Sequence, residues 1–252
     1  MHANAQIYFH DTLNDFLPAA KKNKWIDYSF TGSPALKDAI EALGIPHPEV
    51  DVILVNKTPV GLQHPLKPQD RVEVYPAFAA DPKFKDFSIQ AKLPISDKFI
   101  LDVHLGKLAK SLRLLGFDTY FDVNIPDDKA IATVSDVQNR IVLTRDIGLL
   151  KHKSVRRGYW LRSQSPAEQL KEVISYFQLQ QNAFKPFTRC LVCNSCLTPI
   201  AKEEVWDKIP PKTKLYFNKF YHCPNCKRIY WQGSHYEKML AFIQDLKPTL
   251  KK

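Results

Sequence analysis

Acidic residues of this chain follow apolar, strand-like runs or open helix-like segments, where carboxylates can gather around a metal ion. Asp102 follows the run FIL, and Asp146 follows IVLTR. Asp127 and Asp128 open a segment with helical periodicity. If the two runs are parallel strands of one sheet, their carboxyl ends meet at one edge, where ligands bind. Carboxylates crowded at such an edge suit Mg²⁺ or Mn²⁺, which keep several waters and also bind phosphates.

Each of these acids also has a plainer explanation. Asp146 is a favoured N-cap for a short helix beginning at Ile147, and Asp128 suits the dipole at a helix start. Asp102 has the weakest alternative, because it directly follows a strand-like run and could only partly cap the next segment. Arg145 could contact a substrate phosphate or pair with a neighbouring acid. The convergence of Asp102 and Asp146 favours a metal site, in which one or two ions could activate water against a phosphodiester.

The cysteines form a second chemical motif. C-L-V-C at 190–193 and C-P-N-C at 223–226 are two CxxC pairs, and four thiolates at this spacing suit a tetrahedral Zn²⁺. Five cysteines are an odd number and the cytosol is reducing, so disulfides are disfavoured. Cys196 leaves an ambiguity, because it also has CxxC spacing with the second cysteine of the first pair. We expect a structural zinc ion held by Cys190, Cys193, Cys223 and Cys226.

Composition and charge exclude some classes of protein. The chain has 252 residues, 44% of them hydrophobic, which suffices for two domains with a sizeable core. No apolar run approaches the roughly 18 residues of a membrane span, and the first residues do not resemble a signal peptide, so we expect a cytoplasmic protein. The net charge is +10, and residues 185–252 contribute +8 of it. Such a basic, aromatic-rich segment suits nucleic acid, although a solvated basic surface has the same composition.

The elements that would position these residues divide the chain into parts. Residues 1–80 contain two strand-like runs, a helix-like run opened by Ser33 and Pro34, and two further strands, which predicts an α+β β-grasp fold of the ubiquitin type. Residues 81–97 contain two prolines and no sustained period, so we expect a linker. Residues 98–184 alternate strands and helices, which predicts an α/β domain with a three-layer, mostly parallel sheet.

The predicted helices of residues 98–184 carry further candidates. Gly116 is expected to end the first helix, in which Lys107, Lys110 and Arg113 turn away from a face of leucines. These cations could contact a nucleic-acid backbone or form a solvated face. Before the last helix, Ser165 and Glu168 have the spacing of a capping box, which explains Glu168 better than metal ligation does.

Four segments, FILDVHLGKLAKSLRLLGFDT, IVLTRD, RCLVCNSCL and FYHCPNCKRIYWQGSHYEKM, together resemble the Mut-seven C-terminal RNase family. This resemblance implies a PIN-like nuclease with a zinc ribbon, and it gives Asp102, Asp128 and Asp146 the role of catalytic metal ligands. It also assigns the zinc to the two CxxC pairs and leaves Cys196 as a spare thiol. Residues 1–80 resemble the ubiquitin-like domain often fused ahead of this module. The expected order is a β-grasp domain (1–80), a linker (81–97), a PIN-like domain (98–184), a zinc ribbon (185–240) and a basic tail (241–252).

The residues leave two functions open. The first is a ribonuclease in which Asp102, Asp128 and Asp146 hold Mg²⁺ or Mn²⁺ and Arg145 steadies the phosphate. The second is a non-catalytic adaptor whose ribbon binds RNA while the β-grasp domain recruits an unknown protein partner. An adaptor does not need the three aspartates, so their presence discriminates between the two functions. The RNA partner could be a transfer, ribosomal or messenger RNA. The ribbon residues expected at RNA are Lys227, Arg228, Tyr221, Tyr230 and Trp231, although these aromatics could equally pack against the zinc knuckles.

Overall fold

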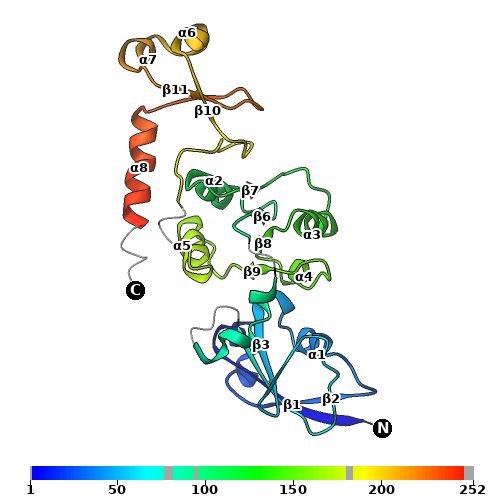
Figure 1. Ribbon diagram of the computed structural model, residues 1–252. Coiled ribbons are helices and arrows are strands. Elements are labelled where there is room, and N and C mark those ends of the chain that lie inside the picture. Colours follow the sequence, from blue (N-terminus) through cyan, green and yellow to red (C-terminus); the bar gives the residue numbers. More distant parts are fainter. Residues whose placement is uncertain (1, 77–81, 94–95, 180–183, 247–252) are drawn as a thin grey trace. The chain divides into compact units, whose positions relative to one another are not determined.

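The computed structural model of this protein describes residues 2–76, 82–93, 96–179 and 184–246 (Figure 1). The chain folds into two compact units. The first unit joins Met1–Ser96 to Pro126–Trp160, and the second joins Asp97–Ile125 to Leu161–Lys252. Each unit is therefore assembled from two segments that are separated in the sequence.

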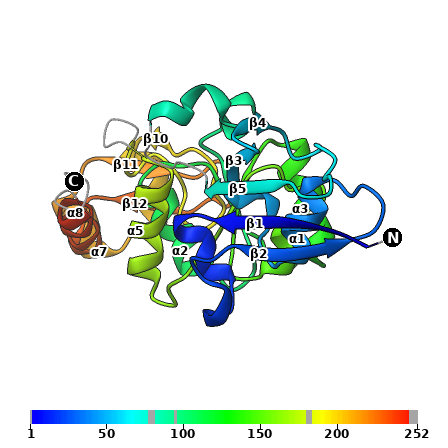
Figure 2. The same cartoon turned by 90° about the horizontal axis from the view of Figure 1, so that it is seen from below.

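The N-terminal part of the first unit is a β-grasp fold. Its five-stranded sheet has the order β2-β1-β5-β3-β4, and Figure 2 shows β2, β1 and β5 side by side. Strand β1 pairs antiparallel with β2 and parallel with β5. Alternate residues of β1 are buried, and Ile7 and Phe9 share a core with Leu36 and Ile40 of the helix. The elements are β1 (Ala3–Phe9), β2 (Ile26–Phe30), α1 (Leu36–Ala42), β3 (Val50–Val55), β4 (Thr58–Val60) and β5 (Arg71–Pro76).

Helix α1 begins later than the sequence predicts. Its N-cap is Ala35, whose side chain cannot cap, and the first helical residue is Leu36. Ser33 donates its hydroxyl to the carbonyl of Leu66 at 3.1 Å instead. The prediction that Ser33 and Pro34 open this helix is therefore wrong, because a long-range bond takes the hydroxyl that a cap would need.

The described residues of the expected linker pack against the β-grasp domain. Asp51 Oδ1 accepts hydrogen bonds from Ser88 Oγ at 2.7 Å and from Gln90 N at 2.8 Å. The Gln90 side chain also donates to the carbonyl of Pro48 at 3.2 Å. The part of this segment around Ser88 and Gln90 is therefore held on the β-grasp domain by hydrogen bonds. The short 3₁₀ helices of the first unit are η1 (Asp11–Phe16), η2 (Ala19–Lys21), η3 (His47–Glu49), η4 (Pro82–Phe87) and η5 (Gln90–Lys92).

The second segment of the first unit carries two parallel strands and two helices. All four residues of β8 are buried, as its apolar composition predicts, and Val142 of β8 is paired with Gly158 of β9. Several hydrogen bonds join this segment to the β-grasp domain. His47 Nε2 donates to the carbonyl of Val155 at 2.8 Å, and Lys151 Nζ donates to the carbonyl of Glu41 at 2.8 Å. The elements are α3 (Asp128–Val137), β8 (Ile141–Thr144), α4 (Ile147–Leu150) and β9 (Gly158–Trp160).

The second unit begins with β6 (Phe99–Leu101), α2 (Gly106–Leu114) and β7 (Thr119–Tyr120), and β6 and β7 are parallel. Helix α2 packs beside α5 (Pro166–Tyr176), as Figure 1 shows. Gly116 ends α2 with a φ of +97°, where a Cβ atom would collide with the carbonyl of Lys185, so the predicted glycine stop is confirmed.

The predicted capping box before α5 does not form. Ser165 occupies the N-cap position, but its side chain makes no capping hydrogen bond. Glu168 Oε1 pairs with Lys171 Nζ at 2.9 Å, so this carboxylate is engaged on the helix surface. The assignment of Glu168 to a helix cap is therefore wrong.

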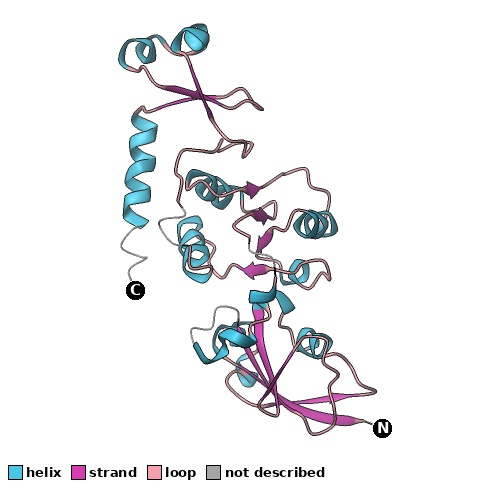
Figure 3. Ribbon diagram, in the orientation of Figure 1, coloured by secondary structure: helices cyan, strands magenta, loops and turns pink. Residues whose placement is uncertain are grey.

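The C-terminal part of the second unit is a small three-stranded domain, which Figure 3 shows with its helices. The antiparallel sheet has the order β10-β11-β12, and Val205, Ile209 and Phe220 form its core. Its last helix continues into the expected tail, of which residues 247–252 lie outside the described residues. The elements are β10 (Thr198–Ile200), α6 (Lys202–Val205), η7 (Trp206–Lys208), α7 (Pro211–Tyr216), β11 (Phe220–His222), β12 (Ile229–Trp231) and α8 (Ser234–Leu246).

Candidate functional site

Asp146 lies two residues beyond β8 and caps α4. Its backbone N–H donates to Thr144 Oγ1 at 2.9 Å, and its side-chain Oδ1 accepts from Gly148 N at 2.6 Å. The residue is exposed, and within the described chain its second oxygen, Oδ2, accepts no hydrogen bond. The N-cap is therefore present, and it leaves one carboxylate oxygen available to a cation.

Asp102 directly follows β6 and is buried, with 8% of its surface exposed. Its Oδ1 accepts a hydrogen bond from His104 N at 2.8 Å, and its carbonyl accepts from Leu105 N at 3.1 Å. These two bonds form the turn that leads from β6 into α2. Asp102 belongs to the second compact unit, whereas Asp146 belongs to the first.

Asp128 is the first residue of α3 and is exposed. Its neighbour Asp127 is the N-cap, because Asp127 Oδ1 accepts from Ala130 N at 2.8 Å. Asp128 is thus not needed as the cap, and its carboxylate lies where the helix dipole favours negative charge. Asp122, after β7, accepts a hydrogen bond from Asn124 N at 2.9 Å and so closes a turn.

Arg145 is exposed, and its backbone is held by a tryptophan. Trp160 Nε1 donates to the carbonyl of Arg145 at 3.1 Å, and the Trp160 ring lies 5.0 Å from that of Phe16. The backbone N–H of Trp160 donates to Glu49 Oε1 of the β-grasp domain at 2.6 Å. No pattern in the sequence predicts this connection, because Glu49 and Trp160 are 111 residues apart.

Four cysteines form a compact cluster in the second unit. The Sγ atoms of Cys190 and Cys226 are 3.5 Å apart, and those of Cys193 and Cys223 are 3.3 Å apart. All four Sγ atoms lie within 4.8 Å of one another. Cys196 is exposed and outside this group. The predicted ligand set is thus brought together, and it could hold a structural zinc ion.

The two CxxC pairs sit in matching turns. Cys190 N donates to the carbonyl of Ser195, and Cys223 N donates to the carbonyl of Arg228, both at 2.8 Å. Directly after each pair, a residue has a left-handed φ, +71° at Asn194 and +62° at Lys227. This repeated geometry directs four thiols toward one point.

The thiols cannot all ionise at such short separations without a cation. Burial raises the pKa of Cys226 to about 12. Burial also opposes ionisation of Cys193, but hydrogen bonds with Ser195 outweigh it and lower the pKa to about 5. Four soft sulfur donors directed toward one point suit a divalent zinc ion, which stabilises thiolates.

Two adjoining basic hollows lie in the second unit. The first is lined by Lys107 and Asp122, the second by Lys208 and Lys227, and the two share Lys110 and Arg228. Within the described chain, the side chains of Lys107, Lys110, Lys208 and Arg228 form no hydrogen bond or ion pair. Lys227 Nζ donates to the carbonyl of Pro224 at 2.6 Å. Unpaired cations at a concave surface suit a polyanion.

Arg113 differs from these lysines, because its guanidinium is buried and hydrogen-bonded. It is only 2% exposed, and its Nε donates to the carbonyl of Thr119 at 3.0 Å. Its Nη1 donates to the carbonyls of Leu191 at 3.1 Å and Val192 at 2.8 Å. The expectation that Arg113 turns away from the core is therefore wrong. Its guanidinium ties the start of β7 to the first cysteine pair.

The aromatic residues expected at RNA are partly used for packing. The Tyr230 hydroxyl lies 3.1 Å from Cys190 Sγ, and Trp231 packs against the ribbon core. Tyr221 is more exposed, at 36%. The sequence did not indicate Phe187, Gln232 or Tyr236, which line an aromatic cavity together with these residues. They come from separate loops and helices, so no periodicity marks them.

These features define a class of protein: a β-grasp domain, a parallel sheet with carboxylates beyond its strands, and a four-cysteine ribbon. Residues 97–243 match the Mut7-C RNAse domain, and residues 2–81 match the Mut7-C ubiquitin domain. The chain belongs to the Mut7-C RNAse domain family, which indicates a nuclease-type function. Neither the curated proteins nor the solved structures provide a match. None of the helices in the described residues has the length and apolar character required to cross a membrane.

Proposed function

We propose that this protein is a metal-dependent ribonuclease that hydrolyses RNA phosphodiester bonds. Membership of the Mut7-C RNAse domain family supports the reaction class. Asp102, Asp128 and Asp146 supply the hard oxygen donors that suit Mg²⁺ or Mn²⁺. When bound, such an ion supplies the Lewis acidity that phosphodiester hydrolysis requires. The observation that carries this proposal is the uncommitted Oδ2 oxygen of the capped and exposed Asp146.

The chain's own groups orient the proposed site. Gly148 N–H holds the Asp146 carboxylate, and His104 N–H holds that of Asp102. Asp102 follows β6 and Asp146 lies two residues beyond β8, and ligands of such sheets bind outside the carboxyl ends of the strands, which supports the choice of these two residues. Arg145 would bind a substrate phosphate through its guanidinium, with its backbone positioned by Trp160.

The second unit would hold the RNA. Lys107, Lys110, Lys227 and Arg228 line the two basic hollows and are the proposed phosphate contacts. A structural zinc ion on the four cysteines would fix the turn that carries Lys227 and Arg228. We place this activity in the cytoplasm, because a cluster of four free thiols suits a reducing compartment.

Substitution of Asp146 by asparagine tests the proposal. Asparagine caps a helix as well as aspartate does, so Asp146→Asn should keep its stability within about 0.5 kcal/mol. It should lose RNA cleavage, because the amide lacks the charge that anchors a divalent cation. Asp127→Asn makes the same change at the cap of α3 and calibrates the stability cost. The measurement is cleavage of single-stranded and structured RNA with added Mg²⁺ or Mn²⁺.

Two controls make this result decisive. Chelators would also remove zinc, so zinc content is measured for each preparation and metal dependence is established by addition of the ion. Cleavage by a folded, zinc-loaded Asp146→Asn protein at the parent rate would remove Asp146 from the metal site.

A second candidate function is a non-catalytic RNA-binding adaptor. One observation favours it: the two basic hollows carry Lys107, Lys110, Lys208 and Arg228, whose side chains form no hydrogen bond or ion pair within the described chain. An adaptor would use the basic hollows and would need no carboxylate site. Metal-independent RNA binding without cleavage, in the parent and in Asp146→Asn alike, is the outcome that this alternative requires.

A further inference from the structure

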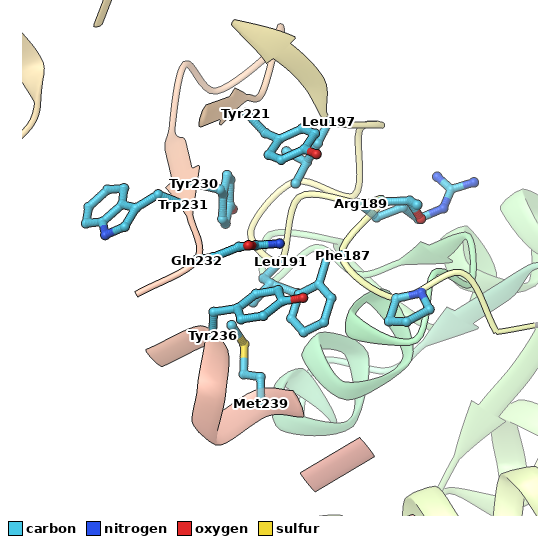
Figure 4. A pocket seen from close by; sticks show the side chains of 12 residues that line it. Phe187, Arg189, Leu191, Leu197, Tyr221, Tyr230, Trp231, Gln232, Tyr236 and Met239 are labelled. Atoms are coloured by element: carbon cyan, nitrogen blue, oxygen red, sulfur yellow. The ribbon is translucent and has the colours of Figure 1, made fainter. Parts of the chain in front are cut away.

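An aromatic cavity of about 310 Å³ lies beside the ribbon sheet in the second unit (Figure 4). Tyr221 and Leu197 lie on one side of it, and Phe187 and Tyr236 lie on the other. The ring centroids of Phe187 and Tyr236 are 4.2 Å apart with an interplanar angle of 34°, so the two rings pack against each other and support one aromatic side of the cavity. The cavity is therefore a slot between aromatic surfaces, of the size range in which small planar groups bind.

One uncommitted polar group reaches into this slot. The side-chain amide of Gln232 extends between the two aromatic sides, and it makes no hydrogen bond with any described residue. Arg189, by contrast, points its guanidinium away from the slot, where it donates to the carbonyl of Gly116 at 3.0 Å and pairs with Asp118 at 3.6 Å. An amide both donates and accepts, which matches the edges of nucleobases.

The slot adjoins the second basic hollow. Leu191, Tyr230 and Trp231 line both of them, so one wall separates the aromatic slot from the cationic surface. The described residues that line this hollow include no acid, and its cations are Lys110, Lys208, Lys227 and Arg228. An aromatic slot beside a patch of unpaired cations is complementary to a nucleotide, whose base is flat and whose phosphate is negative.

We propose that this slot binds an unpaired nucleobase of RNA. The base stacks between Tyr221 and the packed pair of Phe187 and Tyr236, Gln232 hydrogen-bonds its edge, and the neighbouring phosphates contact the basic hollow. This inference rests on the proposed RNA-binding function and adds to it a selection for single strands. Bases in a duplex are stacked and paired, so they cannot enter the slot, whereas phosphate contacts alone would accept a duplex as well.

The test measures binding by the full-length, zinc-loaded protein without added Mg²⁺ or Mn²⁺. Fluorescence anisotropy compares a labelled single-stranded RNA with an abasic ribose-phosphate oligomer of the same length. Tyr221→Leu and Tyr236→Leu should each weaken binding of the RNA by about 5- to 160-fold, the range for loss of one base–aromatic stack. Binding of the abasic oligomer should not change, because its phosphates are intact. Tyr216→Leu is the matched control, since Tyr216 is 74% exposed on α7 and does not line the slot.

Gln232→Leu separates recognition of the base edge from stacking. This variant should bind the four homo-oligomers with more similar affinities than the parent does, with an unchanged salt dependence. Equal discrimination by the parent and Gln232→Leu would remove the amide from the interface.

The outcomes distinguish this inference from the function on which it rests. If both tyrosine variants are folded and zinc-loaded and bind single-stranded RNA as the parent does, the slot is not a base site, although RNA binding stands. If the parent binds neither oligomer, RNA binding itself fails. If Tyr221→Leu changes the sedimentation of the protein and leaves RNA affinity unaltered, the slot holds a second copy of the chain, and the inference is overturned.

Discussion

Replacement of Glu49 by alanine should loosen the attachment of β9 to the β-grasp domain. Glu49 is completely buried, and its Oε1 accepts the backbone N–H of Trp160 at 2.6 Å. Strand β9 is at the edge of its sheet, so this N–H faces away from β8. Trp160 in turn holds the carbonyl of Arg145, the residue before Asp146. The β-grasp domain therefore reaches the proposed catalytic loop through two hydrogen bonds.

The expected magnitude follows from what alanine leaves behind. Loss of the acceptor leaves the Trp160 N–H without its partner, which costs about 1–3 kcal/mol. For a protein of this size, 1 kcal/mol lowers the melting temperature by about 2–4 °C, so Glu49→Ala should melt about 2–12 °C below the parent. Glu49→Gln keeps an oxygen acceptor of the same reach and should lose less.

Two measurements test this reasoning. Thermal unfolding gives the stability of each variant, and hydrogen exchange by mass spectrometry reports on the peptide that contains Trp160. Glu168→Ala is a matched control, because Glu168 makes a surface ion pair with Lys171 that is worth 1 kcal/mol or less. If Glu49→Ala and Glu168→Ala have the same melting temperature, and hydrogen exchange of the β9 peptide is unaltered in Glu49→Ala, then the Glu49 carboxyl group does not hold the strand.

Three further predictions concern the second unit. Cys223→Ser should lower zinc content and destabilise the ribbon, because zinc-binding energy is folding energy there, whereas Cys196→Ser should change neither; metal analysis showing the opposite order would refute the ligand assignment. Removal of Lys227 and Arg228 together should weaken RNA binding and reduce its salt slope by about 2, and a titration with an unchanged slope would exclude both from the interface. Arg113→Lys should lower the free energy of unfolding, measured by urea titration, by about 1–3 kcal/mol, because one ammonium cannot replace a guanidinium that bonds three carbonyls. A stability equal to that of the parent would contradict the structural role of Arg113.

The sequence predicted the elements whose signals are local. The apolar run of β8 and the glycine at position 116 each depend on residues within one turn or strand, and both predictions are confirmed. Spacing also identified the cysteine ligands, because two CxxC pairs limit the geometry that four thiols can adopt. The fold class was predictable for the same reason: alternation of strands and helices is a local pattern with a global consequence.

What the sequence did not predict has a different cause: in each case a side chain hydrogen-bonds a residue that is distant in the sequence. Arg113 looks solvent-facing on a helical wheel, but its guanidinium bonds carbonyls of residues 191 and 192. Ser33 looks like a cap, but Leu66 accepts its hydroxyl. The attachment of Ser88 and Gln90 to Asp51 was not predictable for the same reason, because these bonds leave no periodicity in the chain. Local preference is a weak guide wherever a long-range hydrogen bond is available.

The two explanations of Asp146 are compatible for a physical reason. A cap needs one oxygen, and Oδ1 supplies it to Gly148 N–H at 2.6 Å. That bond fixes the carboxylate's orientation, so less side-chain freedom remains to be lost when Oδ2 binds a cation. A capped aspartate is thus better prepared as a ligand than a free one. The sequence presents cap and ligand as alternatives, but a group with two oxygens can fill both roles at once. Asparagine can fill only the first, because it lacks the charge that anchors a divalent cation.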